Sequence, residues 1–106
     1  MGQRGYGRVD ANVGVTLTLA DGSTRRVDRL RNISLGGVFV EMQEPLSFGA
    51  EVELEFLLPR AREPVRCKGL VVRRELGQDG PGVGLKLLEI EPGDMRRVAD
   101  FLEANL

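Results

Sequence analysis

Apolar residues recur at every second position through most of this 106-residue chain. The clearest case is residues 51–57, where glutamates alternate with apolar residues such as Val52 and Leu54. A period of two places alternate side chains on opposite faces of a β-strand, one face toward a core and the other toward water. The same alternation predicts strands at 13–20 and 65–71, so the chain is constrained to a mainly β fold.

The remaining strands are expected at 24–33, 38–40 and 83–87. In the first of these, Val27, Leu30 and Ile33 lie three residues apart rather than two. This spacing predicts a β-bulge, because an extra residue returns the next apolar side chain to the core face. The dipeptide Asp21-Gly22 separates the first two strands and predicts a hairpin with a type I′ turn.

The period changes to that of a helix only near the C-terminus. From Pro92 onward, apolar residues recur at helical spacing and predict a helix over 92–105. We expect Phe101 and Leu102 to pack against the barrel, with Val98 on the same stripe. Six short antiparallel strands and one helix imply a closed or nearly closed β-barrel with the helix over one open end.

Residues 1–8 show no periodic arrangement of apolar residues of the kind that marks a strand or helix packed on a core. We therefore expect a flexible N-terminal arm over 1–8 and a single domain over 9–106.

Composition excludes several classes of function. The chain has no histidine and a single cysteine, Cys67. These counts exclude an imidazole or thiolate metal site, and Ser–His or Cys–His catalysis. The 15 basic and 16 acidic residues nearly cancel, which argues against a nucleic-acid binder. No apolar run is long enough to insert into a membrane and no signal peptide precedes the domain, so a cytoplasmic protein is expected.

Two short motifs carry the functional information. Arg4-Gly-Tyr-Gly-Arg8 has the pattern RxxxR, and Asn32-Ile-Ser34-Leu-Gly-Gly37 has the pattern [D/N]xSxxG. In this order, and on this series of strands followed by a helix, they resemble the signature of the PilZ domain family. The resemblance covers nearly the whole chain. It implies a six-stranded PilZ-like split barrel that binds cyclic di-GMP through Arg4, Arg8, Asn32, Ser34 and Gly37, with no metal, no cofactor and no catalytic residue.

These residue types suit that ligand. A guanidinium pairs bidentately with a phosphate or with the O6/N7 edge of guanine, which fits Arg4 and Arg8. Asn32 would present its side chain to a base edge, and Ser34 would offer a hydroxyl. Gly37 would let the turn approach the ligand closely or adopt a positive φ.

Each motif residue also has a purely structural interpretation. Arg4 and Arg8 would then be a solvated tail, and Asn32 and Ser34 would only satisfy backbone groups of the turn. The two glycines are needed for the turn with or without a ligand. Four arginines of the second expected strand form either a solvated face or a supporting positive field for an anion: Arg25, Arg26, Arg29 and Arg31. Cys67 is expected to be a buried apolar filler.

The expected function is that of a receptor and adaptor. The chain ends shortly after the expected helix, so its output would pass through an unidentified effector protein. The resemblance implies a role in bacterial motility, surface polysaccharide or development. The alternative is a PilZ-like interaction module that has lost nucleotide binding. An enzyme is the least expected class, because Glu51, Glu53 and Glu55 have the pattern of an outer strand face.

Overall fold

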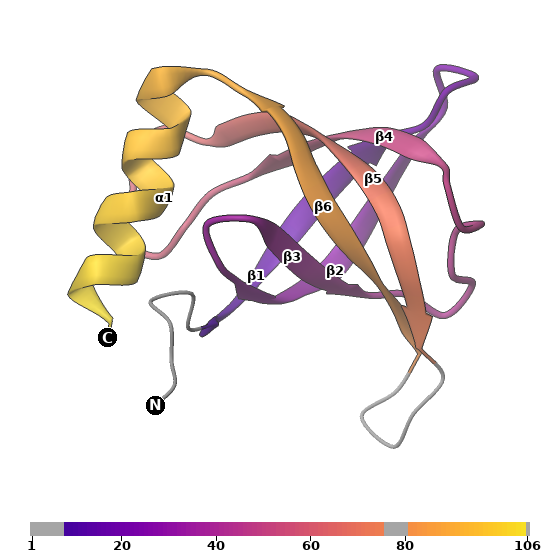
Figure 1. Ribbon diagram of the computed structural model, residues 1–106, viewed down its shortest axis with the longest axis horizontal. Coiled ribbons are helices and arrows are strands. Elements are labelled where there is room, and N and C mark those ends of the chain that lie inside the picture. The colour runs from indigo at the N-terminus through magenta and orange to yellow at the C-terminus, as the bar shows by residue number, and fades with distance from the viewer. Residues whose placement is uncertain (1–7, 76–80, 106) are drawn as a thin grey trace.

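The computed structural model describes residues 8–75 and 81–105. Its elements in chain order are β1 (Val9–Thr18), β2 (Thr24–Ile33), β3 (Gly37–Glu41), β4 (Glu51–Phe56), β5 (Val65–Glu75), β6 (Gly82–Ile90) and α1 (Pro92–Ala104). The strands pair in the order β1-β2-β3-β6-β5-β4, every neighbouring pair is antiparallel, and β4 closes the barrel on β1 (Figure 1). The predicted mainly β fold, a six-stranded antiparallel barrel with one C-terminal helix, is confirmed.

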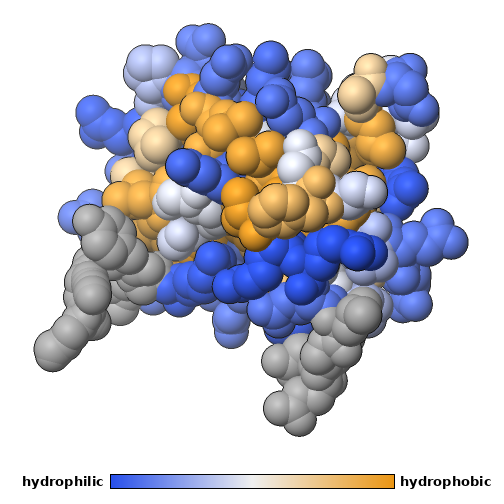
Figure 2. Space-filling view, turned by 45° about the vertical axis from the view of Figure 1, so that its right-hand side comes forward, coloured by the Kyte–Doolittle hydropathy of each residue, from blue (hydrophilic) through white to orange (hydrophobic). Residues whose placement is uncertain are grey.

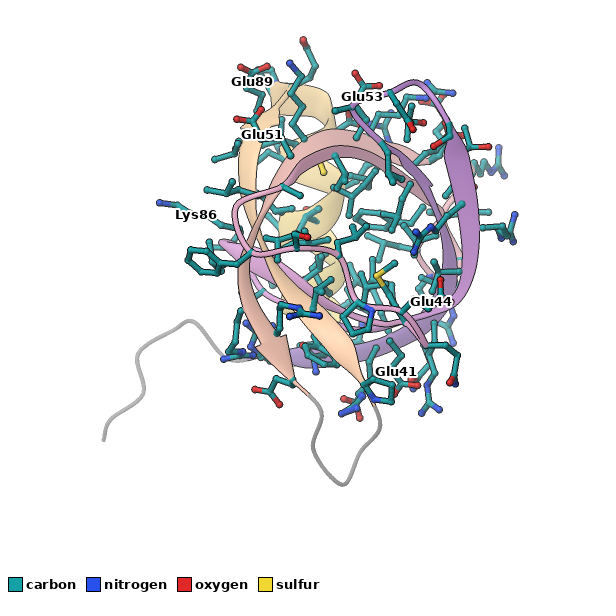
Figure 3. All side chains as sticks on the ribbon, turned by 90° about the vertical axis from the view of Figure 1, so that its right-hand side faces the viewer. Glu41, Glu44, Glu51, Glu53, Lys86 and Glu89 are labelled. Atoms are coloured by element: carbon teal, nitrogen blue, oxygen red, sulfur yellow. The ribbon has the colours of Figure 1, made fainter. Side chains whose placement is uncertain are left out.

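Strand β4 shows why the alternating sequence forms this barrel. Val52, Leu54 and Phe56 are 3%, 2% and 2% exposed, whereas the glutamates between them face water. Figure 3 looks into the barrel and shows side chains filling its interior. The barrel is therefore a packed core, and burial of this apolar surface is the main source of its stability.

The hairpin between β1 and β2 differs from the predicted type I′ turn. That turn needs a positive φ at both central residues, but Gly22 has a φ of 87° while Asp21 is not in the left-handed region. The Gly22 N–H donates to the Leu19 carbonyl at 2.9 Å, and the Leu19 N–H donates to the Ser23 carbonyl at 2.8 Å. The loop is thus a turn extended by one left-handed glycine, and the Asp21 carboxylate accepts hydrogen bonds from the Ser23 N–H and hydroxyl.

The predicted bulge in the second strand is confirmed, and it has a counterpart in the first. The pairing of β1 with β2 shifts by one residue between Asp10 and Val13 and shifts back before Val15. Asn12, with a φ of 52°, lies in the first shift. A further shift follows Leu30 where β2 pairs with β3. The bulges let apolar residues three apart in β2 reach the same interior.

Helix α1 lies across one end of the barrel (Figure 1). Val98 and Leu102 are 0% and 7% exposed and belong to the core, whereas Phe101 is only partly buried against it. The expected contact of the helix with the barrel is therefore present, but Leu102 rather than Phe101 is its buried large residue. The helix ends at Ala104, one residue before the predicted end, where the Asn105 side-chain amide donates to the Phe101 carbonyl at 2.8 Å.

The lone thiol lies in β5 beneath this helix. Cys67 is 7% exposed, as expected of an apolar filler. Burial, reinforced by the negative charge of Asp94, raises the pKa of the thiol to about 12. In the unfolded chain a thiol has a pKa of about 8.5.

We expect native Cys67 to react slowly with a disulfide reagent at pH 8, because only the thiolate attacks. Denaturant should restore rapid reaction. Since the pKa is raised in the folded state, the free energy of unfolding should be unaffected below about pH 8.5 and fall as the pH rises toward the folded value. Thiol labelling and denaturant melts across this range measure both effects, and rapid labelling of the folded protein would contradict the burial.

Two findings bear on the classes of function excluded above. Within 8–75 and 81–105, no helix has the length and apolar character needed to cross a bilayer. In the same residues, no group of three potential metal-ligating side chains is found.

Candidate functional site

The turn between β2 and β3 is closed by Ser34. The Ser34 N–H donates to the Gly37 carbonyl at 2.9 Å, and its hydroxyl lies 3.4 Å from both that carbonyl oxygen and the Gly36 nitrogen. The residue is 8% exposed. Ser34 therefore has the turn-closing role that the sequence offered as its structural interpretation.

Gly37 is required by the packing of two strands. A Cβ atom on this residue would lie 2.7 Å from the carbonyl oxygen of Leu85 in β6. Its φ is not positive, contrary to one expectation from the sequence. The close approach that excludes a side chain is thus to the backbone of the neighbouring strand, which pairs with Gly37 through Lys86.

The two sequence motifs meet where β1 begins and β2 ends. The Arg8 Nη1 donates to Asn32 Oδ1 at 2.7 Å, across 24 residues of sequence. Pairing of Asp10 with Asn32 in the β1–β2 ladder brings them together. Arg8 is therefore anchored to the second motif rather than being a free solvated tail, whereas Arg4 lies outside the described residues.

A surface pocket of about 460 Å³ opens beside this contact. The first and second motifs line it through Arg8, Ser34, Gly36 and Gly37, and strands β5 and β6 complete its wall with Val72, Arg73, Gly84, Leu85 and Lys86. Asn32 does not line the pocket, but it accepts a hydrogen bond from Arg8, which does. In Figure 3 the Lys86 side chain points away from the barrel.

The pocket concentrates positive charge. Partial burial and then the nearby positive charge of Arg73 lower the pKa of Arg8, although a guanidinium stays protonated at neutral pH. Among the carboxylates whose side chains are described, none pairs with Arg8, and Asn32 gives it only a neutral acceptor. Two guanidiniums that repel one another at the same pocket favour an anionic ligand.

Arg73 and Lys86 are the residues that the sequence motifs did not reveal. They join the pocket because β6 lies between β3 and β5. The alternation of apolar residues and the turn motifs in the sequence do not specify this long-range pairing of strands. One signal was available: Gly84 interrupts the apolar pattern of β6, and a glycine inside a strand often marks a close approach by another group.

The arginines of β2 lie elsewhere. Three of them line a separate hollow with Glu41 and Glu44, and none lines the pocket beside Arg8. Arg29 and Arg31 form ion pairs with Glu41 at 3.8 and 2.8 Å, and Arg31 also lies 4.9 Å from the centroid of the Phe39 ring. Glu41 thus partly compensates the positive charge of these arginines. This fits a solvated strand face better than a positive field directed at the pocket.

Comparison with known proteins places these features in a family. The model of the PilZ domain matches residues 2–104. No curated protein matches the sequence. Similar solved structures include the Bacillus subtilis inhibitor of motility MotI/DgrA (24% identity, TM-score 0.82, covering 98% of this chain and 51% of that one). Escherichia coli YcgR, solved in complex with c-di-GMP, is similar at 23% identity and a TM-score of 0.74, covering 96% of this chain and 45% of its own.

The PilZ domain of CeSA from a cellulose-synthesizing bacterium has 22% identity and a TM-score of 0.61, covering 92% of this chain and 96% of that one. The chain thus spans about half the length of MotI/DgrA and YcgR. At these identities the likeness shows the barrel fold, and the family model, which covers nearly the whole sequence, shows the family. The chain belongs to the PilZ domain family.

Proposed function

We propose that this PilZ domain binds cyclic di-GMP in the pocket beside Arg8, through Arg4, Arg8, Asn32, Ser34 and Gly37. The observation that carries the proposal is the convergence of Arg8 and Arg73 on one pocket that is also lined by Ser34, Gly36 and Gly37. The similar protein YcgR, solved in complex with c-di-GMP, supports the choice of ligand. The role is that of a receptor rather than an enzyme.

The chemistry of the ligand matches the pocket. Cyclic di-GMP carries two phosphate charges, and guanidiniums bind phosphate through paired, charge-assisted hydrogen bonds. Asn32 accepts a hydrogen bond from Arg8 through its amide oxygen, and its amide nitrogen can donate to an acceptor on the ligand, such as O6 or N7 of guanine. The position of a Cβ atom on Gly36 is open, with nothing within 4 Å, so a flat base can approach the turn there.

Isothermal titration with cyclic di-GMP tests the proposal. Charge-assisted contacts contribute roughly 1.5–3 kcal/mol each, and loss of translational freedom and ordering of chain and ligand consume much of this gain. We therefore expect a Kd near micromolar, about −8 kcal/mol, that rises with salt because charges at the surface are screened. Cyclic di-AMP is the matched control, since it has the same phosphates without the guanine O6. No binding at millimolar ligand would refute the proposal.

We further propose that the domain acts as an adaptor that signals to a partner protein in the cytoplasm. The similarity to a motility inhibitor favours control of motility as the output, with surface polysaccharide and development as the other candidates. In this role the ligand changes the surface around the pocket, and the partner binds the changed surface better than the original one.

A second candidate function is a protein-interaction module without a nucleotide. The observation that favours it is an apolar area in the middle of the face shown in Figure 2, bordered by hydrophilic residues. Phe48 is 72% and Val72 43% exposed, and the Gly49 N–H bonds to the Val71 carbonyl, so the Phe48 loop lies beside β5. The titration separates the two functions, because only the receptor binds the nucleotide.

A further inference from the structure

The side chain of Arg73 lies flat on the outer surface of the barrel. Arg73 in β5 is paired with Gly84 in β6. A Cβ atom on Gly84 would lie 3.4 Å from the Arg73 Cβ, 3.5 Å from its Nε and 3.6 Å from its Nη2. The Arg73 side chain therefore lies over Gly84 from its Cβ to its guanidinium, and Gly84 is buried as a result. A side chain supported in this way loses less conformational freedom when it binds a ligand than a free surface arginine does.

The supported guanidinium lines the pocket described above, together with Arg8. It also forms an ion pair with a carboxylate, because its Nε lies 3.1 Å from Oε2 of Glu75. Both partners are about half exposed, at 52% and 45%. An ion pair this exposed is weak and exchanges readily with other anions.

Arg73 thus faces two opposing electrostatic influences. Arg8 repels it, and Glu75 attracts it. An anion bound in the pocket would relieve the first and compete with the second, since a phosphate offers the same bidentate acceptor geometry as a carboxylate.

We propose that Arg73 is a third arginine of the nucleotide site, that it binds a ligand phosphate together with Arg8, and that Glu75 competes with the ligand for it. The inference rests on the proposed function for the identity of the ligand, but the placement of Arg73, Gly84 and Glu75 does not depend on it. Glu75 acts in this arrangement as an internal competitor that lowers the affinity of the site.

Titrations of four variants with cyclic di-GMP test the inference. Arg73→Ala should weaken binding about tenfold, whereas Arg74→Ala, which removes the adjacent exposed arginine that does not line the pocket, should leave binding within about twofold. Glu75→Gln should tighten binding by about two- to fivefold, which is the range expected for losing an exposed ion pair. The double variant Arg73→Ala/Glu75→Gln should bind no more tightly than Arg73→Ala alone.

The double variant separates competition from a general charge effect. If Glu75→Gln tightens binding equally when Arg73 is absent, Glu75 acts on the net charge of the surface and the competition is refuted. If Arg73→Ala binds as tightly as Arg74→Ala, the third arginine is refuted. Weaker binding by Glu75→Gln would show that the carboxylate positions Arg73, which also contradicts the proposal.

A second probe distinguishes this inference from the proposed function. Pyrophosphate carries phosphate groups without a guanine and is titrated against the same variants. If the parent protein binds pyrophosphate with the predicted dependence on Arg73 and Glu75 but does not bind cyclic di-GMP, the receptor function fails and the anion site stands. If the parent binds neither probe, both are refuted.

Discussion

Replacing Arg8 by alanine should weaken the binding of cyclic di-GMP at least about 30-fold, corresponding to roughly 2 kcal/mol or more. The side chain lines the pocket, and its partner in the structure is the neutral Asn32. The melting temperature should be almost unchanged, because exposed arginines contribute little to stability and the freed Asn32 oxygen lies where water replaces the lost hydrogen bond. Isothermal titration and thermal melts on the same samples measure the two effects.

Two further variants serve as controls for Arg8. Arg8→Lys keeps the charge but loses the paired N–H groups, so its affinity should fall between those of the parent and Arg8→Ala. Arg62→Ala removes an exposed arginine that does not line the pocket, and it should bind like the parent. Binding by Arg8→Ala as tight as that of the parent would show that the RxxxR motif has no part in the site.

Replacing Leu102 by alanine should lower the free energy of unfolding by about 2–5 kcal/mol, the range for a buried leucine whose removal leaves a cavity. Leu102 is 7% exposed and belongs to the side of α1 that is buried in the core. Phe101→Ala should lower the free energy of unfolding by less than the same substitution at a fully buried phenylalanine, since Phe101 is only partly buried. A loss of this size is a large fraction of the stability of a small domain.

Denaturant unfolding of each variant provides the measurement. Glu103→Ala, on the exposed side of the same helix, should change the free energy of unfolding by less than about 0.5 kcal/mol. No residue of α1 lines the pocket beside Arg8, so Leu102→Ala should retain nucleotide affinity wherever it is folded. A melting curve of Leu102→Ala equal to that of the parent would mean that the helix does not contribute to the core in solution.

Much of the fold could be predicted because the apolar residues at every second position of a strand are the ones whose side chains are buried in the core. Glu51–Phe56 appears as a strand with the predicted faces, and the spacing of Val27, Leu30 and Ile33 indicated a bulged strand. The failures concern geometry that short motifs leave open. Asp21-Gly22 fits two hairpin loops, and the hydrogen bonds of the Asp21 carboxylate to Ser23 favour the longer one.

Only those site residues that belong to a short sequence motif could be predicted. The motifs identified Arg8 and Asn32, and the structure joins them by a hydrogen bond, while their contact with a ligand stays a prediction. Gly37 was assigned to the ligand, yet the carbonyl oxygen of Leu85 by itself excludes a side chain there. The sequence did not place Arg73 in the site, because nothing in its own segment shows that β5 reaches the pocket across β6.

The paired bulges of β1 and β2 limit how the gene of such a domain can change in length. One extra residue near Asn12 is balanced by one extra residue on the opposite strand, so the register before and after the pair is the same. An in-frame deletion of the Asn12 codon would leave two steps on each strand between Asp10 and Val13. Val9 would still pair with Ile33, but it would then lie an odd number of residues from Val13 and would turn away from the core. The deletion would also displace Arg8 from Asn32. Insertions and deletions in this hairpin should therefore be tolerated only as matched pairs, one on each strand, whereas the loop at its tip is free of that restriction.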